Sequence, residues 1–447
     1  MGKPMKHFII ITAVLFAICQ PLTATQKESA PAKPASKKLS EKIKYLTKKA
    51  YQGDAPAQFN LAGIYNFGIG VTKDHKEAVK WYTKAAQQEH PAAQSSLAYM
   101  YSEGKGITAD IKQALKWYTK AAEHEYAFAQ FNLGKIYFQG NGTGKDYKEA
   151  FKWYTKAAAQ NLPAAQCSLA AMYANGHGVT QDDKEAAKWY TKAAEQDYPA
   201  AQFQLGMMYD FGKGVSEDHK EAVKWLTKAA EHGIAGAQFN LGVMYDSGKG
   251  VQKDDKEAVK WFRKSAEQGF AGAQFNLGVM YDLGNGVAQD YKEAVKWYTK
   301  AAQQKLAAAQ YRLGMMYNTG KGGTEDHKEA IKWLTKAAQQ ELADAQYNLG
   351  FMYAIARGVS KDDKQAFKWF SKAAHQRLPL AQYSLSLMYA NGEGVTADFV
   401  QAYKWILIAE TNGYDVPETK EILKKEMKPA QITQAQRLAK QHAKKQK

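Results

Sequence analysis

Three histidines are the residues whose type and spacing come nearest to a metal site. His75, His219 and His327 occupy one position of a 36-residue sequence period. Equivalent positions three or four periods apart would lie roughly 25–40 Å apart in a stacked array of helices, whereas zinc ligands lie about 2 Å from one ion. The three side chains therefore cannot share a metal, and we expect them to be solvated residues in the first turn of a helix. The sequence also contains neither Cys-x-x-Cys nor His-Glu-x-x-His, so we predict no metal and no cofactor.

Two short motifs bear on serine and phosphate chemistry. Ser102 and Lys105 have the Ser-x-x-Lys spacing of the nucleophile in β-lactamases and penicillin-binding proteins. The motif falls in a turn containing Gly104 and Gly106, not at a helix start, and its Ser-Asp-Asn and Lys-Thr-Gly partners are missing. The glycine-rich segment 140–145 ends in lysine like a phosphate-binding loop, but an aspartate follows where that loop needs Ser or Thr. We interpret both segments as turns and predict no catalytic residue.

The tryptophans show which elements must position the rest of the chain. All ten lie 36 residues apart, from Trp81 to Trp405. One period held over this length indicates a repeat array, in place of the roughly three domains that 447 residues would suggest. With 45% hydrophobic and 12% aromatic residues, the chain is also not disordered. Ten units fill residues 54–413, and residues 39–53 resemble the second half of a unit and are predicted to cap the N-terminal end.

Each unit predicts two helices joined by a glycine turn. In the unit at 234–269, apolar residues of the first helix recur at three and four residues, and Gly248 and Gly250 end that helix. Asp254 and Glu257 then form a capping box that opens the second helix, and Asp-x-x-Glu/Gln recurs in all ten units. Small residues in both helices would allow close approach while columns of Trp, Tyr and Met fill the core. We therefore predict an all-α fold, an α-α superhelix (solenoid) of ten 36-residue helix-turn-helix repeats.

The N-terminal 24 residues have the pattern of a secretory signal peptide. A basic start precedes an apolar run over 8–18 that is too short for a membrane span. We expect residues 1–24 to be removed by cleavage near Ala24, with an uncleaved anchor and lipidation at Cys19 as alternatives. Residues 25–38, rich in Ala, Pro, Ser and Lys, are predicted to be a flexible linker. The expected localisation is the periplasm of a bacterium, or secretion.

The formal charge of +17 is concentrated toward the ends of the chain. Residues 25–53 carry +6 and residues 414–447 carry +5, whereas the repeats between hold 42 basic and 38 acidic side chains. A protein that binds nucleic acid needs a dense basic surface on its folded part. We therefore expect no nucleic-acid partner, while the basic ends leave contact with an anionic envelope surface open.

The unit at 235–270, AGAQFNLGVMYDSGKGVQKDDKEAVKWFRKSAEQGF, resembles the Sel-one-like repeat, a relative of the tetratricopeptide repeat. The resemblance covers residues 54–413, and the segment 427–439 is similar to the helix that often closes such proteins. It implies an α-solenoid adaptor that holds other proteins, with residues 414–447 forming a C-terminal capping helix and a basic tail. One departure is local, because Ala356 replaces the first glycine of a turn; we expect Ile355 to be exposed there.

Two positions on the first helix of the repeat are candidates for binding a partner. One lies in the variable part of the helix, which lines the concave face in tetratricopeptide relatives, and amides there could pair with a peptide backbone; a solvated polar face is the alternative. The candidates at this position are Asn132, Gln204, Asn240, Asn276, Arg312 and Asn348. The other position holds Asp210, Asp246 and Asp282 in three consecutive units. Because carboxylates near a helix C-terminus oppose its dipole, their recurrence indicates either a site for a basic partner or a surface kept soluble.

These observations predict an exported, non-enzymatic scaffold that binds a protein or peptide ligand in the groove of a monomeric repeat array. One alternative is an enzyme or binder directed at the cell wall or at β-lactams, since some cysteine-rich secreted relatives have been linked to β-lactam binding or hydrolysis. This chain lacks their pair of cysteines in each repeat. The other alternative is a binder of the envelope surface that uses the basic ends.

Overall fold

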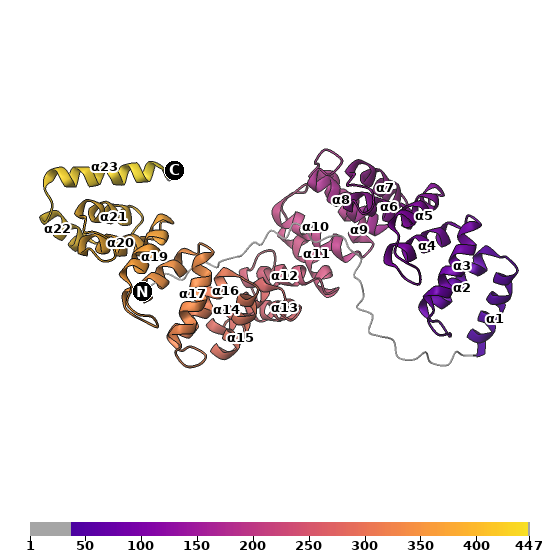
Figure 1. Cartoon of the computed structure of the whole chain (residues 1–447), viewed down its shortest axis with the longest axis horizontal. Coiled ribbons are helices and arrows are strands. Elements are labelled where there is room, and N and C mark those ends of the chain that lie inside the picture. The colour runs from indigo at the N-terminus through magenta and orange to yellow at the C-terminus, as the bar shows by residue number, and fades with distance from the viewer. Residues whose placement is uncertain (1–36, 446–447) are drawn as a thin grey trace. The chain divides into compact units, whose positions relative to one another are not determined.

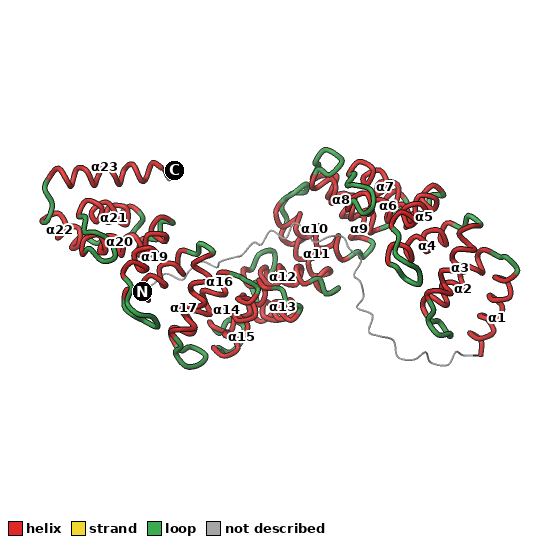
Figure 2. The backbone as a smooth tube through the Cα atoms, viewed as in Figure 1, coloured by secondary structure: helices red, strands yellow, loops and turns green. Residues whose placement is uncertain are grey.

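The computed structural model describes residues 37–445, and within this range it contains helices and turns but no strand (Figure 2). The predicted signal peptide, 1–24, and the linker up to residue 36 lie outside the described residues. None of the described helices has the length and apolar content needed to cross a membrane. The described chain is an all-α solenoid, as the sequence predicts.

The chain divides into two compact units. The N-terminal unit comprises residues 37–237 and 249–251, and the C-terminal unit comprises residues 238–248 and 252–445. Consecutive helices pack against each other within a unit, for example α2 on α3 and α3 on α4.

Each repeat has two helices, which Figure 1 labels in chain order. The first helices of the ten repeats are α2 Ala55–Phe67, α4 Pro91–Glu103, α6 Ala127–Gln139, α8 Pro163–Asn175, α10 Pro199–Phe211, α12 Ala235–Ser247, α14 Ala271–Leu283, α16 Ala307–Thr319, α18 Ala343–Ala354 and α20 Pro379–Asn391. The second helices are α3 His75–Gln87, α5 Ile111–Glu123, α7 Tyr147–Ala159, α9 Asp183–Glu195, α11 His219–Glu231, α13 Asp255–Glu267, α15 Tyr291–Gln303, α17 His327–Gln339, α19 Asp363–His375 and α21 Phe399–Thr411.

The predicted aspartate caps begin the second helices. The Asp74 carboxylate accepts a hydrogen bond from the backbone N–H of Glu77 at 3.0 Å, and the equivalent aspartate does the same in every repeat. The return bond of a capping box is not formed, because the Asp74 N–H already donates to the Tyr65 carbonyl at 2.9 Å. Glu77 pairs instead with Lys80 at 2.8 Å. The aspartate therefore joins the two helices of a repeat as well as starting the second.

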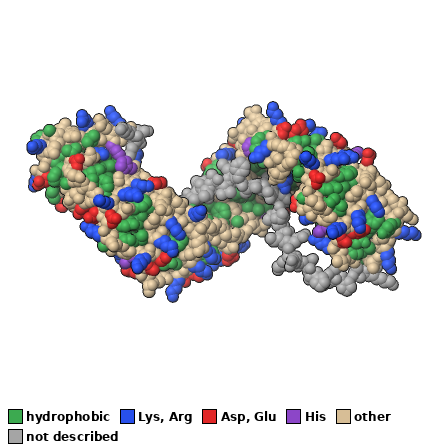
Figure 3. All heavy atoms as spheres, in the orientation of Figure 1, with side chains coloured by type: hydrophobic (Ala, Val, Ile, Leu, Met, Phe, Trp, Pro, Cys, Tyr) green, Lys and Arg blue, Asp and Glu red, His purple; other side chains and the backbone are tan. Residues whose placement is uncertain are grey.

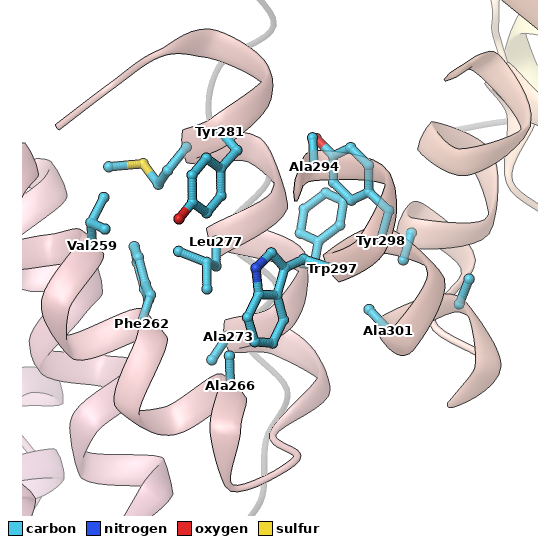
Figure 4. Packing of buried hydrophobic residues seen from close by; sticks show 14 of the residues in the cluster. Val259, Phe262, Ala266, Ala273, Leu277, Tyr281, Ala294, Trp297, Tyr298 and Ala301 are labelled. Carbon is cyan, nitrogen blue, oxygen red and sulfur yellow. The ribbon is translucent and has the colours of Figure 1, made fainter. Parts of the chain in front are cut away.

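Small residues in the first helix make room for the aromatic core. A Cβ atom on Gly278 would lie 2.7 Å from the ring of Tyr298, so any larger residue would displace that ring. Tyr298 belongs to a buried cluster with Phe262, Leu277 and Trp297, part of which is shown in Figure 4. Trp297 is only 4% exposed, which confirms that the tryptophan column is core here.

The second glycine of the turn is where neighbouring repeats come closest. A Cβ atom on Gly214, at φ 68°, would collide with the backbone carbonyl of Asp183 in the preceding repeat. The same collision with the start of the preceding second helix would occur at Gly178 and Gly286. The sequence pattern explained these glycines by helix termination alone. In the structure they are also required for one repeat to stack on the next.

A row of buried glutamines connects successive repeats, and the sequence pattern did not predict it. The Gln58 amide donates to the Ala50 carbonyl at 3.0 Å and its Oε1 accepts from the Gln88 amide at 2.8 Å. Eight such amide pairs occur: Gln88–Gln58, Gln160–Gln130, Gln196–Gln166, Gln268–Gln238, Gln304–Gln274, Gln340–Gln310, Gln376–Gln346 and Asn412–Gln382. A buried amide costs free energy unless it is hydrogen-bonded. The amide pair joins the first helix to the end of the second helix of its own repeat, and the bond from the same glutamine to an alanine carbonyl joins that repeat to the preceding one.

Both ends of the array have additional helices. Helix α1, Lys37–Tyr51, covers the predicted half-repeat 39–53 and starts two residues earlier. At the C-terminal end we expected one capping helix, but two form, α22 Pro417–Lys425 and α23 Pro429–Lys445. A proline has no N–H to donate and is favoured in the first turn of a helix, so Pro429 starts a new helix. Leu423, Met427 and Ala435 from this region are buried against α21.

The turn after α18 differs from the others, as the sequence indicated. The helix ends one residue early, at Ala354, and Ile355 is 49% exposed. Ala356 adopts φ 57°, in the left-handed region where nine other repeats have glycine. Arg357 contacts the preceding repeat through His327 at 3.3 Å. The turn is therefore preserved, with an alanine in a conformation that L-residues avoid.

Candidate functional site

Several large apolar side chains at the start of the N-terminal unit are exposed, although the repeats bury most of the others. Phe67 is 66% exposed, Phe128 is 55% exposed and Ile69 is 46% exposed. Figure 3 shows hydrophobic side chains gathered at the surface over the N-terminal helices, beside charged ones. Contiguous exposed apolar surface of this kind marks a site of interaction.

These side chains line a groove with a volume of about 910 Å³. The groove is lined by residues from α1 to α6, and Ile43 and Leu46 of α1 are among them. Its volume is near the upper end of the range of about 300–1,000 Å³ that is typical of ligand sites. We call it the N-terminal groove.

Helical spacing explains why these residues share the groove. Asn60, Ile64 and Phe67 of α2 are four and three residues apart, which places them on one face of the helix. Ser96 and Tyr99 of α4 stand at the positions equivalent to Asn60 and Gly63 in the preceding repeat, and they also line the groove. The stacking of repeats therefore brings the same face of successive first helices to one surface.

Asn132 is the predicted binding residue that lies in the N-terminal groove. It lines the groove from α6, and Asn60 and Ser96 line it from the same repeat position on α2 and α4. We call the residues at this position of the ten repeats the polar row. Its side-chain amide donates to the Phe128 carbonyl at 2.8 Å, which holds the side chain along α6. The polar row thus supplies hydrogen-bonding groups to an otherwise apolar groove.

The charged side chains that line the N-terminal groove are all basic. They are Lys42 from α1, and Lys73 and Lys105 from the turns after α2 and α4, and no carboxylate is among the lining residues in the part of the chain that the structure describes. The Lys105 ammonium donates to the Tyr99 hydroxyl at 2.7 Å and lies 4.7 Å from the centre of that ring. This contact holds one of the cations at the groove.

His75 also lines the groove, where burial and neighbouring charges affect its imidazole ring. Its Nδ1–H donates to Asn66 Oδ1 at 2.9 Å. Burial lowers the pKa of His75, and the positive charges of Lys73 and Lys105 lower it further. The negative charge of Asp74 opposes this shift, and the lowered pKa favours the neutral imidazole.

The other predicted members of the polar row lie on first helices further along the chain. They occupy the equivalent half-buried position on α10, α12, α14, α16 and α18, at Gln204, Asn240, Asn276, Arg312 and Asn348. Asn348 donates to the Asp344 carbonyl at 2.8 Å and lies 3.4 Å from the Tyr311 hydroxyl. Burial raises the pKa of Asp344, and the positive charge of Arg312 opposes that rise. These last contacts are within the C-terminal unit.

The three predicted aspartates are half-buried near the ends of α10, α12 and α14. Asp210 lies 3.0 Å from the Lys249 ammonium and 3.2 Å from the His219 ring, so part of its charge is balanced within the N-terminal unit. Asp282 lies 3.4 Å from the Tyr298 hydroxyl. Asp246 belongs to the C-terminal unit, as Asp282 does, whereas Asp210 belongs to the N-terminal unit. A site for a basic partner on these residues stays a prediction.

The residues considered for metal or serine chemistry are engaged in the turns. His219 lies 3.1 Å from Glu217 and His327 lies 3.4 Å from Glu325. Within residues 37–445 no group of three or more His, Cys, Asp or Glu side chains is arranged to hold a metal ion. The Ser102 hydroxyl donates to the Tyr99 carbonyl at 2.9 Å.

The lysines and the exposed aromatic residues of the N-terminal groove were not among the predicted site residues. A signal for one of them is present in the sequence. Phe67 occupies a repeat position that is Glu103, Gln139 and Asn175 in the next three repeats, so its apolar character is a departure from the pattern. The three lysines show no such departure.

Known proteins share this architecture. Ten helix pairs with conserved turns define a repeat scaffold, and each pair matches the model of the Sel1 repeat; the matches cover residues 55–90, 91–126, 127–162, 163–198, 199–234, 235–270, 271–306, 307–342, 343–377 and 379–414. The chain therefore belongs to the Sel1 repeat family, which confirms the resemblance.

Two solved structures extend this comparison. A protective antigen present in uropathogenic Escherichia coli strains, which displays an SLR fold, is 39% identical, with a TM-score of 0.83 over 91% of this chain and 87% of the antigen. A Sel1 repeat protein from Oxalobacter formigenes is 32% identical, with a TM-score of 0.52 over 72% of this chain and 98% of that protein. No curated protein matches the chain.

Proposed function

We propose that this chain is an exported, non-enzymatic scaffold that holds a partner protein by a segment bound in the N-terminal groove. The observation that carries the proposal is the groove itself, in which Phe67 and Phe128 are exposed beside the polar side chains of Asn60 and Asn132. The Sel1 repeat is a fold that generally mediates interactions between proteins. An apolar groove with a few polar groups has the composition expected of a binding site, and the protein acts as a monomer that offers this surface.

A crosslinking experiment tests the groove. The photoreactive residue p-benzoylphenylalanine replaces Phe67 in one variant and Phe211 in a matched control. Phe211 occupies the equivalent position four repeats later. It is also exposed, at 45%, but it does not line the groove. We expect a defined partner to be crosslinked from position 67 and not from position 211.

A second variant shows whether crosslinking depends on the groove being open. A Cβ atom on Gly63 would meet only the Tyr82 hydroxyl, at 3.9 Å, so Gly63→Phe can fill the groove without a clash at Cβ. Gly63→Ala is the control that leaves most of the volume free. Capture from position 67 should be lost with Gly63→Phe and retained with Gly63→Ala; equal capture in both variants would contradict binding in the groove.

Export rests on the signal-like pattern of residues 1–24. The similar Escherichia coli protein is described as a protective antigen, which supports a location outside the cytoplasm for a relative with the same fold. Mass spectrometry of the chain recovered from the periplasm or the medium should find an N-terminus at Thr25. A chain that retains Met1 and stays with the cytoplasmic fraction would contradict export. Purified protein should also fail to hydrolyse peptidoglycan or nitrocefin.

A further inference from the structure

The chemistry of the N-terminal groove restricts what its occupant can be, given the proposed function on which this inference rests. Lys42, Lys73 and Lys105 approach the groove from three separate elements, and no carboxylate of residues 37–445 lines it. The groove therefore differs from the rest of the array in its charge. The repeats as a whole hold nearly equal numbers of basic and acidic residues, whereas this groove carries only positive charge.

The cations have positions set by the fold. A Cβ atom added to Gly68 would lie 3.2 Å from the Cβ of Lys73. The turn after α2 is therefore tight, and it fixes the position from which the Lys73 side chain extends. Lys105 is held on Tyr99 by a hydrogen bond and by its position over the ring. A cation stacked on an aromatic ring keeps its charge available to a ligand, since the ring neutralises none of it.

Apolar side chains line the groove together with these cations. Phe67, Tyr99 and Phe128 line the same groove and are 66%, 41% and 55% exposed. Exposed aromatic residues bind the apolar side chains of a partner and supply much of the binding energy of an interface. An occupant must therefore match both features of the lining, with apolar side chains for the aromatic residues and negative charge for the lysines.

We propose that the occupant is a segment of a partner protein that combines Asp or Glu residues with apolar side chains. Charge argues against a second copy of this chain bound through its ends, because residues 25–53 and 414–447 carry +6 and +5. A basic segment in the groove would place its positive charges beside those of the lysines, and the repulsion would disfavour its binding. Lys42, Lys73 and Lys105 are the residues that select the acidic segment, and Phe67 and Phe128 bind its apolar side chains.

Selection from a random library of 12-residue peptides displayed on phage tests this inference. The full chain is the target, and the enriched peptides should combine Asp or Glu with Leu, Ile, Phe or Trp. A fluorescein-labelled enriched peptide is then titrated against the protein by anisotropy. The same peptide with every Asp and Glu changed to Lys should bind at least about tenfold more weakly, since its charges meet the lysines of the groove.

Two triple variants separate the groove lysines from charge in general. Lys42→Gln, Lys73→Gln and Lys105→Gln together should raise the Kd of the acidic peptide about tenfold or more and remove most of its dependence on salt. Lys44→Gln, Lys145→Gln and Lys213→Gln remove the same charge from α1 and from equivalent turns that do not line the groove, and they should change the Kd less than about twofold. Circular dichroism melts establish that both variants fold.

The outcomes distinguish this inference from the proposed function. Enrichment of basic peptides, or an unchanged Kd in the groove triple variant, would overturn the acidic segment while crosslinking from position 67 left the groove in place. Binding of phosphatidylglycerol vesicles that is lost in the groove variant, with no peptide enriched, would overturn a protein segment as the occupant. Loss of crosslinking from position 67 would remove the proposed function and this inference together.

Discussion

The buried Oε1 of Gln94 has no hydrogen-bond donor among the described residues because His124 stands where eight other repeats have a side-chain amide. In the next repeat, Gln160 occupies that position and donates to Gln130 at 2.8 Å. The same substitution at His232 leaves the Oε1 of Gln202 without a partner. The amide row is therefore interrupted twice, both times in the N-terminal unit.

Restoring the amide at the first interruption should stabilise the protein. His124→Gln supplies a donor to Gln94, and a hydrogen bond to a buried group contributes about 1 kcal/mol to the free energy of unfolding. The measurement is the midpoint of urea unfolding followed by circular dichroism. Gln160→His is the reverse change in the neighbouring repeat and should destabilise by about 1–3 kcal/mol. The same sign of effect for both variants would contradict the role of the amide row. His232→Gln should gain less, because His232 already contacts Asp197 at 3.0 Å.

The second glycine of the turn should be intolerant of a side chain for a reason other than its backbone angle. Gly214 and Gly144 have nearly the same φ, 68° and 67°, but a Cβ would clash only at Gly214. Gly144→Ala should cost about 1–2 kcal/mol, from the left-handed conformation alone. Gly214→Ala should cost about 1–3 kcal/mol more, since the repeats would be forced apart. Thermal melts compare the two, and equal losses would show that the close approach adds nothing.

The alanine in the left-handed region offers a stabilising change. Ala356 adopts φ 57°, so Ala356→Gly should raise the free energy of unfolding by about 1 kcal/mol. Ala354→Gly places the same substitution at the end of α18 and should lower stability by about 0.5–1 kcal/mol. Differential scanning calorimetry of the two variants provides the test. A lower Tm for Ala356→Gly would mean that the alanine is not strained.

Asp344 should make stability depend on pH in the direction opposite to that of most carboxylates. Because burial raises its pKa in the folded state, the folded state binds more protons than the unfolded state between the two pKa values, and stability falls as pH rises through them. Asp344→Asn should therefore raise the unfolding midpoint at pH 7 and have little effect at pH 3, where the carboxyl is protonated in both states. The difference from the parent chain at each pH is the quantity to compare. A difference that is the same at both pH values would count against the burial of this carboxylate.

The sequence predicted the elements of the fold because the determining patterns are local. The spacing of Trp81 and Trp117 defines the repeat, and Asp74 lies one position before the helix it caps. Gln58 and Gln88 are different, since each has only the pattern of an exposed polar residue, and the packing of α2 against α3 brings them together. The spacing also predicted a bond from the Asp74 N–H to the Glu77 side chain. In the structure that N–H donates to the Tyr65 carbonyl instead.

The candidate site was predicted only in part for a related reason. Asn132 could be proposed because it belongs to a row that recurs with the repeat. Lys42 and Lys105 lie in unrelated sequence contexts, one in the half-repeat and one in a turn, and nothing in their spacing indicates that they line one groove. Recurring positions are visible in a sequence of this kind, whereas a feature confined to one end of the array requires the folded chain.

The bond from the Gln58 amide to the Ala50 carbonyl also bears on how such a chain can change its length in evolution. The surfaces that meet between repeats are made of equivalent residues, a glutamine amide bonded to an alanine carbonyl of the preceding repeat and a turn glycine. Unequal recombination that removes or adds 36 codons therefore rejoins two matching surfaces wherever it occurs within the array. A lineage can lose or gain whole repeats in a single event without creating a new interface, and the cap and the N-terminal groove are inherited intact when the event falls after the third repeat.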